Sequence, residues 1–159
     1  MNIKDVKLIE LRLHEDDRGY LFEIIHKSDG FVSGEGQELK QVYIVGDRIE
    51  RITRAFHKHD ELHDWFCIVK GSAKFILVDD RKESPTHQKY DLVVCSDRFP
   101  KLLVVPPGIF HGWMSLEPAT IMVSTASHEY NREKPDEHRV PPNHFDQLFG
   151  ENPWEIKGK

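Results

Sequence analysis

The chain has 159 residues, of which 38% are hydrophobic and 31% are charged, and its formal net charge is -5. This length suits one domain spanning residues 1–159, with the composition of an ordinary soluble globular protein. No apolar run approaches transmembrane length and no long basic block offsets the acids, so we expect binding to neither membranes nor nucleic acid. The first seven residues lack the apolar stretch of a secretory signal, which favours the cytoplasm.

Short apolar or alternating segments recur along the first 125 residues, separated by glycine, proline and polar residues, as in an all-β protein. The predicted strands are residues 7–13, 20–26, 39–45, 49–59, 65–69, 74–78, 90–95, 102–105 and 120–125. The largely apolar segments 90–95 and 102–105 should be central in the sheets. Residues 27–38, with three glycines and two serines, are interpreted as a loop that serves as a lid or a dimer contact.

The tail, residues 128–159, differs from the rest because prolines are scattered among many charges. We expect it to wrap the body of the protein more than to build it. One short helix is predicted over residues 143–149, with Asn143 as its N-cap after two prolines. Cys67 and Cys95 lie in apolar runs without metal-like spacing, so they are predicted to be buried, reduced thiols.

Histidines and acids concentrate in one stretch and are matched by a second. His57 and His59 are two residues apart, so on an extended chain both imidazoles project from one face, and Asp64 begins the next apolar run. His111 follows a proline-glycine turn after another apolar run. The spacings H-x-H-x4-D-x6-G and P-x-G-x2-H resemble the two signature motifs of cupins. That resemblance implies a double-stranded β-helix, or jelly-roll barrel, with a short C-terminal helix.

Longer motifs resemble the dTDP-4-dehydrorhamnose 3,5-epimerase family. They are D-R-G at 17–19 with Glu23, the pair Arg54 and His57, V-D-D-R-x-x-S-P-T at 78–86, and P-P-G-x-x-H-G at 106–112. The segment HKHDELH at 57–63 is also similar to the H-x-H-K-x-x-H motif of nucleotide-sugar 3,4-ketoisomerases. Both comparisons point to cupins that act on 4-keto nucleotide sugars.

The resemblance implies an isomerase that epimerises or isomerises a 4-keto-6-deoxy nucleotide sugar, in deoxysugar or surface polysaccharide biosynthesis. His57, or His59 by the ketoisomerase comparison, removes the proton next to the keto group, and Tyr130 acts as general acid unless Glu129 occupies that position. The implied partners are the nucleotide sugar and a second copy of the chain in a homodimer, and no cofactor is implied. The expected substrate-binding residues are Arg18, Glu23, Arg54, Asp64 and His111.

The chain departs from the family at sites that matter for catalysis. Asp64 stands where the family has a lysine that stabilises the enolate, and residues 140–143 contain no acid to orient the catalytic histidine. Arg54 lies three residues before His57, so a shared site requires a bulge between them.

Two alternatives therefore stay open beside the epimerase. One is a metal-dependent cupin, an oxygenase or a lyase, that holds one divalent transition metal. The other is a catalytically inactive cupin that only binds a nucleotide sugar. The ligands in the metal-dependent case are His57, His59, Asp64 and His111.

Overall fold

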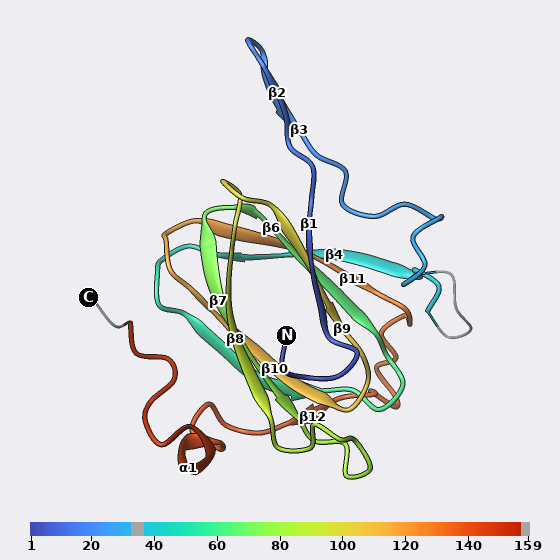
Figure 1. Ribbon diagram of the computed structural model, residues 1–159, viewed down its shortest axis with the longest axis vertical. Helices are drawn as coiled ribbons and strands as arrows, with labels where there is room; N and C mark the ends of the chain where they lie inside the picture. The colour runs from blue at the N-terminus through green and yellow to red at the C-terminus, as the bar shows by residue number, and fades with distance from the viewer. Residues whose placement is uncertain (33–36, 157–159) are drawn as a thin grey trace.

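In the computed structural model, which describes residues 1–32 and 37–156, two five-stranded antiparallel sheets face each other (Figure 1). The first sheet has the order β1 (Lys7–Glu10), β9 (Lys101–Val105), β6 (Asp64–Lys70), β11 (Thr120–Ala126) and β4 (Gln41–Asp47). The second has the order β12 (His138–Arg139), β5 (Thr53–Lys58), β10 (Ile109–Ser115), β7 (Ser72–Asp79) and β8 (Tyr90–Ser96). The predicted all-β jelly roll is confirmed.

Apolar side chains from both sheets meet between them and form the main core. Phe66 and Leu103 from the first sheet pack with Phe75, Leu77 and Trp113 from the second, and all five are buried. These residues alternate along their strands with residues that point to the outer faces, as the pleat of a strand requires.

The outer faces of both sheets are covered as well. On the first sheet, Trp65 and Leu102 are buried beneath the segment that contains Phe22 and Phe31. On the second sheet, Phe56 and Phe110 are buried beneath the C-terminal tail, whose members in this cluster are Val140, Phe145, Leu148, Phe149 and Trp154. Strands covered on both faces do not need a polar side, which explains why β6, β7 and β10 are apolar almost throughout.

Several local predictions were wrong. Residues 22–26 form no strand, since their apolar side chains cover a sheet face instead of pairing with a neighbour. β8 is an edge strand, with Leu92 and Val94 about half exposed, so the prediction that it is central in its sheet was wrong. The same prediction for β9 was correct, because β9 is paired on both sides. The helix α1 is only Asp146–Phe149, and Asn143 does not cap it. The predicted loop at 27–38 lies partly outside the described residues.

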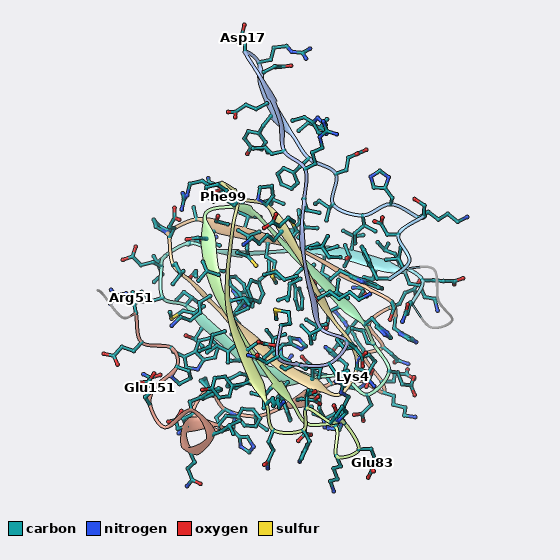
Figure 2. All side chains as sticks on the ribbon, viewed as in Figure 1. Lys4, Asp17, Arg51, Glu83, Phe99 and Glu151 are labelled. Atoms are coloured by element: carbon teal, nitrogen blue, oxygen red, sulfur yellow. The ribbon has the colours of Figure 1, made fainter. Side chains whose placement is uncertain are left out.

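A small hairpin of β2 (His14–Asp16) and β3 (Gly19–Leu21) projects away from the two sheets (Figure 1). Asp17 marks its tip in Figure 2. Tyr20 and Leu21 are about 60% exposed on it. On this hairpin, called the arm below, the Tyr20 ring stacks on Phe22, but the described residues leave most of the Tyr20 and Leu21 side chains uncovered.

The motif at 78–86 has a structural role. Asp79 is fully buried and accepts hydrogen bonds from the Arg81 guanidinium at 2.9 Å, Ser84 Oγ at 2.7 Å and Thr86 Oγ1 at 2.6 Å. Burial opposes ionisation of this carboxyl, but the hydrogen bonds hold its pKa well below the ordinary value. A Cβ at Gly108 would lie 2.4 Å from Arg81 Cγ, so the loop anchored on Asp79 also packs against the 106–108 turn.

Both cysteines are free and buried, as predicted, and burial raises the pKa of Cys67 to about 12 and of Cys95 to about 11. Within residues 1–32 and 37–156, no helix is long and apolar enough to cross a membrane.

Candidate active site

A cavity of about 1020 Å³ opens between the sheets. Its walls come from β4, β5, β6, β10 and β11, and residues 128–131 and 134–139 of the tail close one side. Eight of the residues that line the cavity could take part in chemistry or binding, and six of them were singled out in the sequence. The eight residues are Tyr43, Arg54, His57, His59, Asp64, His111, Tyr130 and Glu137.

The pairing of β5 with β10 places two of the histidines opposite each other. His111 pairs with His57, but Trp113 pairs with Arg54. A step of two residues along β10 therefore corresponds to a step of three residues along β5. This irregularity is the bulge that a shared site requires, and both Arg54 and His57 line the cavity. A Cβ at Gly112 would lie 2.4 Å from Ala55 Cβ, so glycine is needed where the strands approach most closely.

His57 has a carboxylate beside it that sequence reasoning missed. Glu137 Oε1 lies 3.6 Å from His57 Nδ1, and Arg139 Nη2 binds the other oxygen of Glu137 at 2.8 Å. Burial lowers the pKa of His57, and Glu137 partly offsets that effect. The family resemblance placed the orienting acid at residues 140–143, which contain none. The pairing of β12 with β5, which puts Arg139 opposite His57, brings an earlier residue of the tail to that place.

His59 and His111 both present Nε2 to the buried carboxylate of Asp64. Oδ2 of Asp64 lies 3.4 Å from His59 Nε2 and 3.6 Å from His111 Nε2. Each ring is held on its other side by a main-chain carbonyl, that of Asp136 for His59 and that of Ile109, at 3.2 Å, for His111. Burial raises the pKa of Asp64 and lowers that of His111 to about 3.

The loop after β5 is fixed by the tail and by the 106–108 turn. The Asp136 carboxylate accepts hydrogen bonds from the backbone N–H groups of Asp60, Glu61 and Leu62 at 2.8 to 3.0 Å. Gly108 donates its N–H to the carbonyl oxygen of His59 at 2.7 Å. These contacts set the position of His59 beyond the end of its strand.

Arg54 does not neutralise Asp64. Its guanidinium binds Asp47 Oδ1 at 2.8 Å and lies 5.8 Å from the centre of the Trp113 ring. The side chain stays 43% exposed, so a face of the guanidinium remains open to the cavity. Arg54 can therefore contact an anionic ligand while Asp47 and Trp113 hold it in place.

Two tyrosines line the cavity, of which only Tyr130 was anticipated. Tyr130 is 62% exposed, and its backbone N–H donates to Gln41 Oε1 at 2.7 Å. Tyr43 lies on β4, where burial, followed by the charge of Asp64, raises its pKa to about 12. Its place in the strand pattern resembles that of any half-exposed aromatic residue, so no feature of the sequence marks Tyr43 as a cavity residue.

Arg18 and Glu23 are not in this cavity. Arg18 follows Asp17 at the tip of the arm (Figure 2) and is paired with Asp16 at 2.5 Å, and Glu23 pairs with His26 at 3.3 Å. His63, which lies just before Asp64, stacks on Trp65 and does not line the cavity. The structure thus brings together Arg54, His57, His59, Asp64, His111 and Tyr130 and leaves Arg18 and Glu23 apart from them.

Comparisons with known proteins agree on one family. A sequence model described as dTDP-4-dehydrorhamnose 3,5-epimerase matches residues 1–146. A spore coat polysaccharide biosynthesis protein of Bacillus subtilis is 32% identical over 141 residues, which are 87% of this chain and 89% of that protein. A probable low-salt glycan biosynthesis epimerase of Haloferax volcanii is 27% identical over 162 residues, 99% of each chain.

Solved structures have the same fold. The dTDP-4-dehydrorhamnose 3,5-epimerase of Bacillus anthracis, crystallised with TDP and PPi bound, superposes with a TM-score of 0.77 at 26% identity. The superposition covers 88% of this chain and 81% of that one. A 4-keto-6-deoxy sugar epimerase of Streptomyces spheroides, at 23% identity and a TM-score of 0.79, covers 90% of this chain and 72% of its own, and supports the fold alone.

The close approach of β5 and β10 yields a test of the site's framework. Replacing Gly112 with alanine puts a methyl group against Ala55, so we expect the free energy of unfolding to fall by about 1–3 kcal/mol, as in other overpacked cores. Gly46→Ala is the matched control, because the nearest atom to its added Cβ is 3.8 Å away. Urea denaturation measures both variants. Equal stability of the two would contradict the steric role of Gly112.

Proposed function

Because the chain belongs to the dTDP-4-dehydrorhamnose 3,5-epimerase family, we propose that it epimerises or isomerises a 4-keto-6-deoxy nucleotide sugar. The reaction begins with removal of a proton from the carbon next to the keto group and ends with its return. A role in making a surface polysaccharide or glycan agrees with the names of the two relatives from Bacillus subtilis and Haloferax volcanii. The cytoplasmic location stays a prediction.

The observation that carries this proposal is the pairing of His57 with Glu137 at the cavity wall. The carboxylate faces Nδ1 at 3.6 Å, which favours the tautomer with hydrogen on Nδ1 and leaves the Nε2 lone pair free to accept a proton. Glu137 is fixed by Arg139 and is 17% exposed, so it can hold the ring in one orientation. A histidine oriented by a carboxylate is suited to act as a general base.

The remaining groups of the cavity suit the other parts of the reaction. Tyr130 is exposed at the cavity, where its hydroxyl can return a proton to the sugar as general acid. Arg54 offers its guanidinium to the diphosphate, which it can bind through two parallel hydrogen bonds. His59, Asp64 and His111 form the wall beside His57, with the rings of His57 and His111 6.2 Å apart.

We also propose that the protein is a homodimer. β4 is an edge strand, and Val42 and Ile44 on it are 58% and 71% exposed. The arm, whose tip at Asp17 is labelled in Figure 2, carries the exposed side chains of Tyr20 and Leu21 away from its own body, and Arg18 lies in its turn between β2 and β3. An unpaired apolar edge and an unsupported arm on one chain can cover each other when two copies associate. Substrate binding by Arg18 and Glu23 is then possible only across the dimer.

The first test measures deuterium incorporation from solvent into a panel of 4-keto nucleotide sugars. His57→Asn should lower the exchange rate about 10²- to 10⁴-fold, the usual contribution of a general base, while the fold stays intact. His63→Asn is the matched control, because His63 lies outside the cavity. If His59→Asn abolishes exchange while His57→Asn does not, the base is His59, as in the ketoisomerase comparison. Absence of exchange with every sugar would favour the inactive binding protein.

The second test concerns Glu137. Glu137→Gln keeps the size of the side chain but removes the charge that orients His57, so we expect kcat for exchange to fall with little change in KM. Glu137→Asp retains the charge and should recover part of the rate. A rise in KM with unchanged kcat would instead place Glu137 in substrate binding.

The third test is sedimentation at micromolar concentration, which should show a dimer. Ile44→Glu places a charge in the proposed interface and should shift the protein toward monomer. Val94→Glu is the control, because Val94 is similarly exposed, at 52%, on the edge strand of the other sheet. A wild-type monomer, or equal dissociation of both variants, would refute this interface.

A further inference from the structure

The side chain of Asp64 has an unusual environment for a buried carboxylate. It is only 3% exposed, and its ion-pair contacts among the described residues are with two histidine nitrogens, at 3.4 and 3.6 Å. No hydrogen bond from residues 1–32 or 37–156 reaches its oxygens, and Arg54 is engaged with Asp47. A buried carboxylate normally has a cation or several N–H donors beside it.

The two histidines cannot supply those donors in their neutral form. A main-chain carbonyl only accepts hydrogen bonds, so Nδ1 of His59, facing Asp136 O, and Nδ1 of His111, facing Ile109 O, carry the ring hydrogens. Each Nε2 then carries a lone pair and points toward Asp64 Oδ2. Three electron-pair donors, two ring nitrogens and one carboxylate oxygen, therefore lie within 4.8 Å of one another. A single proton on Asp64 could satisfy one ring but not both.

The spacing of these atoms fits a metal ion. Two ligand atoms bound at about 2.1 Å with a tetrahedral angle are about 3.4 Å apart, close to both distances from Asp64 Oδ2. All three ligand atoms lie within 4.8 Å of one another. The carbonyl contacts at the two Nδ1 atoms are also those that orient metal-binding histidines.

We propose that His59, Asp64 and His111 bind one divalent transition-metal ion on the wall of the cavity. Two imidazoles and one carboxylate suit zinc, iron or manganese, and three protein ligands leave a coordination position open toward the cavity. His57 does not belong to this group of ligand atoms within 4.8 Å of one another, and its Nε2 is the atom assigned to proton removal. This narrows the four-residue set of the sequence analysis to three.

A metal ion at this site would also replace the positive charge of the lysine that the family has at the position of Asp64. This part of the inference rests on the proposed function. A bound divalent ion would supply the positive charge that Asp64, in place of a lysine, cannot supply to the enolate oxygen. The chain's own residues keep the roles given above: His57 removes the proton, and His59, Asp64 and His111 hold the ion.

The experiment measures metal binding without any sugar. Protein treated with EDTA and then freed of it is titrated with ZnCl2 in a calorimeter, and its thermal unfolding is followed with and without zinc. We expect one zinc ion per chain and a higher midpoint of unfolding. Asp64→Asn should weaken binding more than about 100-fold, beyond the usual effect of an outer-shell partner, and remove the thermal shift.

Asp60→Asn is the matched control, because Asp60 is an exposed carboxylate next to His59 whose Oδ2 contacts His138 at 2.7 Å. It should bind zinc as the wild type does, and circular dichroism checks that both variants are folded. Absence of zinc binding in the wild type, or equal binding by Asp64→Asn, overturns the site.

The role of the ion is tested separately by solvent deuterium exchange. Exchange should stop in the metal-free protein and return on adding metal, and exchange that continues at the same rate without metal overturns the assigned role. If the metal-loaded wild type binds zinc but exchanges with no 4-keto sugar, the proposed function fails while the metal site stands.

Discussion

The close pairing of β5 with β10 determines the geometry of the whole site. Gly112 lets the two backbones approach at Ala55, and the bulge beside it turns Arg54 and His57 to the same cavity. The same pairing sets His57 opposite His111, which in turn faces Asp64 on the other sheet. Because protein cores are close-packed, a shift of these strands would move every one of these groups together.

The C-terminal tail completes the site as well as covering a sheet. Its aromatic residues bury the outer face of β5 and β10, and β12 adds a short strand to the edge of β5. That pairing places Glu137 beside His57 and the main-chain carbonyl of Asp136 beside His59. The orientation of both histidines therefore depends on contacts between distant residues, His59 with Asp136 and His57 with Glu137.

Electrostatics distinguish this cavity from that expected for its family. Aspartate stands at position 64, where the family resemblance implies a lysine, and the two arginines that line the cavity are already paired, Arg54 with Asp47 and Arg139 with Glu137. Burial makes an uncompensated charge at Asp64 costly, and the converging lone pairs of two imidazoles increase that cost. A cation or a proton shared among these groups is a physical requirement of the arrangement. The metal proposal identifies one way in which this chain meets it.

The sequence by itself determined the fold class, the family and most of the cavity residues. Alternation and apolar runs reveal strands because side chains on a strand alternate between two faces, and the histidine spacing depends only on local geometry. The exposed β8 and the unpaired segment at 22–26 were misjudged because apolar composition indicates burial but does not say what covers a residue.

Only the tertiary structure decided which groups pair. Glu137 and Tyr43 carry no local pattern that marks them, and Arg18 matches a family motif yet lies on an arm outside its own cavity. The narrowing of four candidate ligands to three came from the distances among their ligand atoms, because those of His59, Asp64 and His111 lie within 4.8 Å of one another and His57 is not in that group. Such partners are set by strand register and by packing between distant segments, which are long-range properties of the folded chain that the order of residues does not display locally.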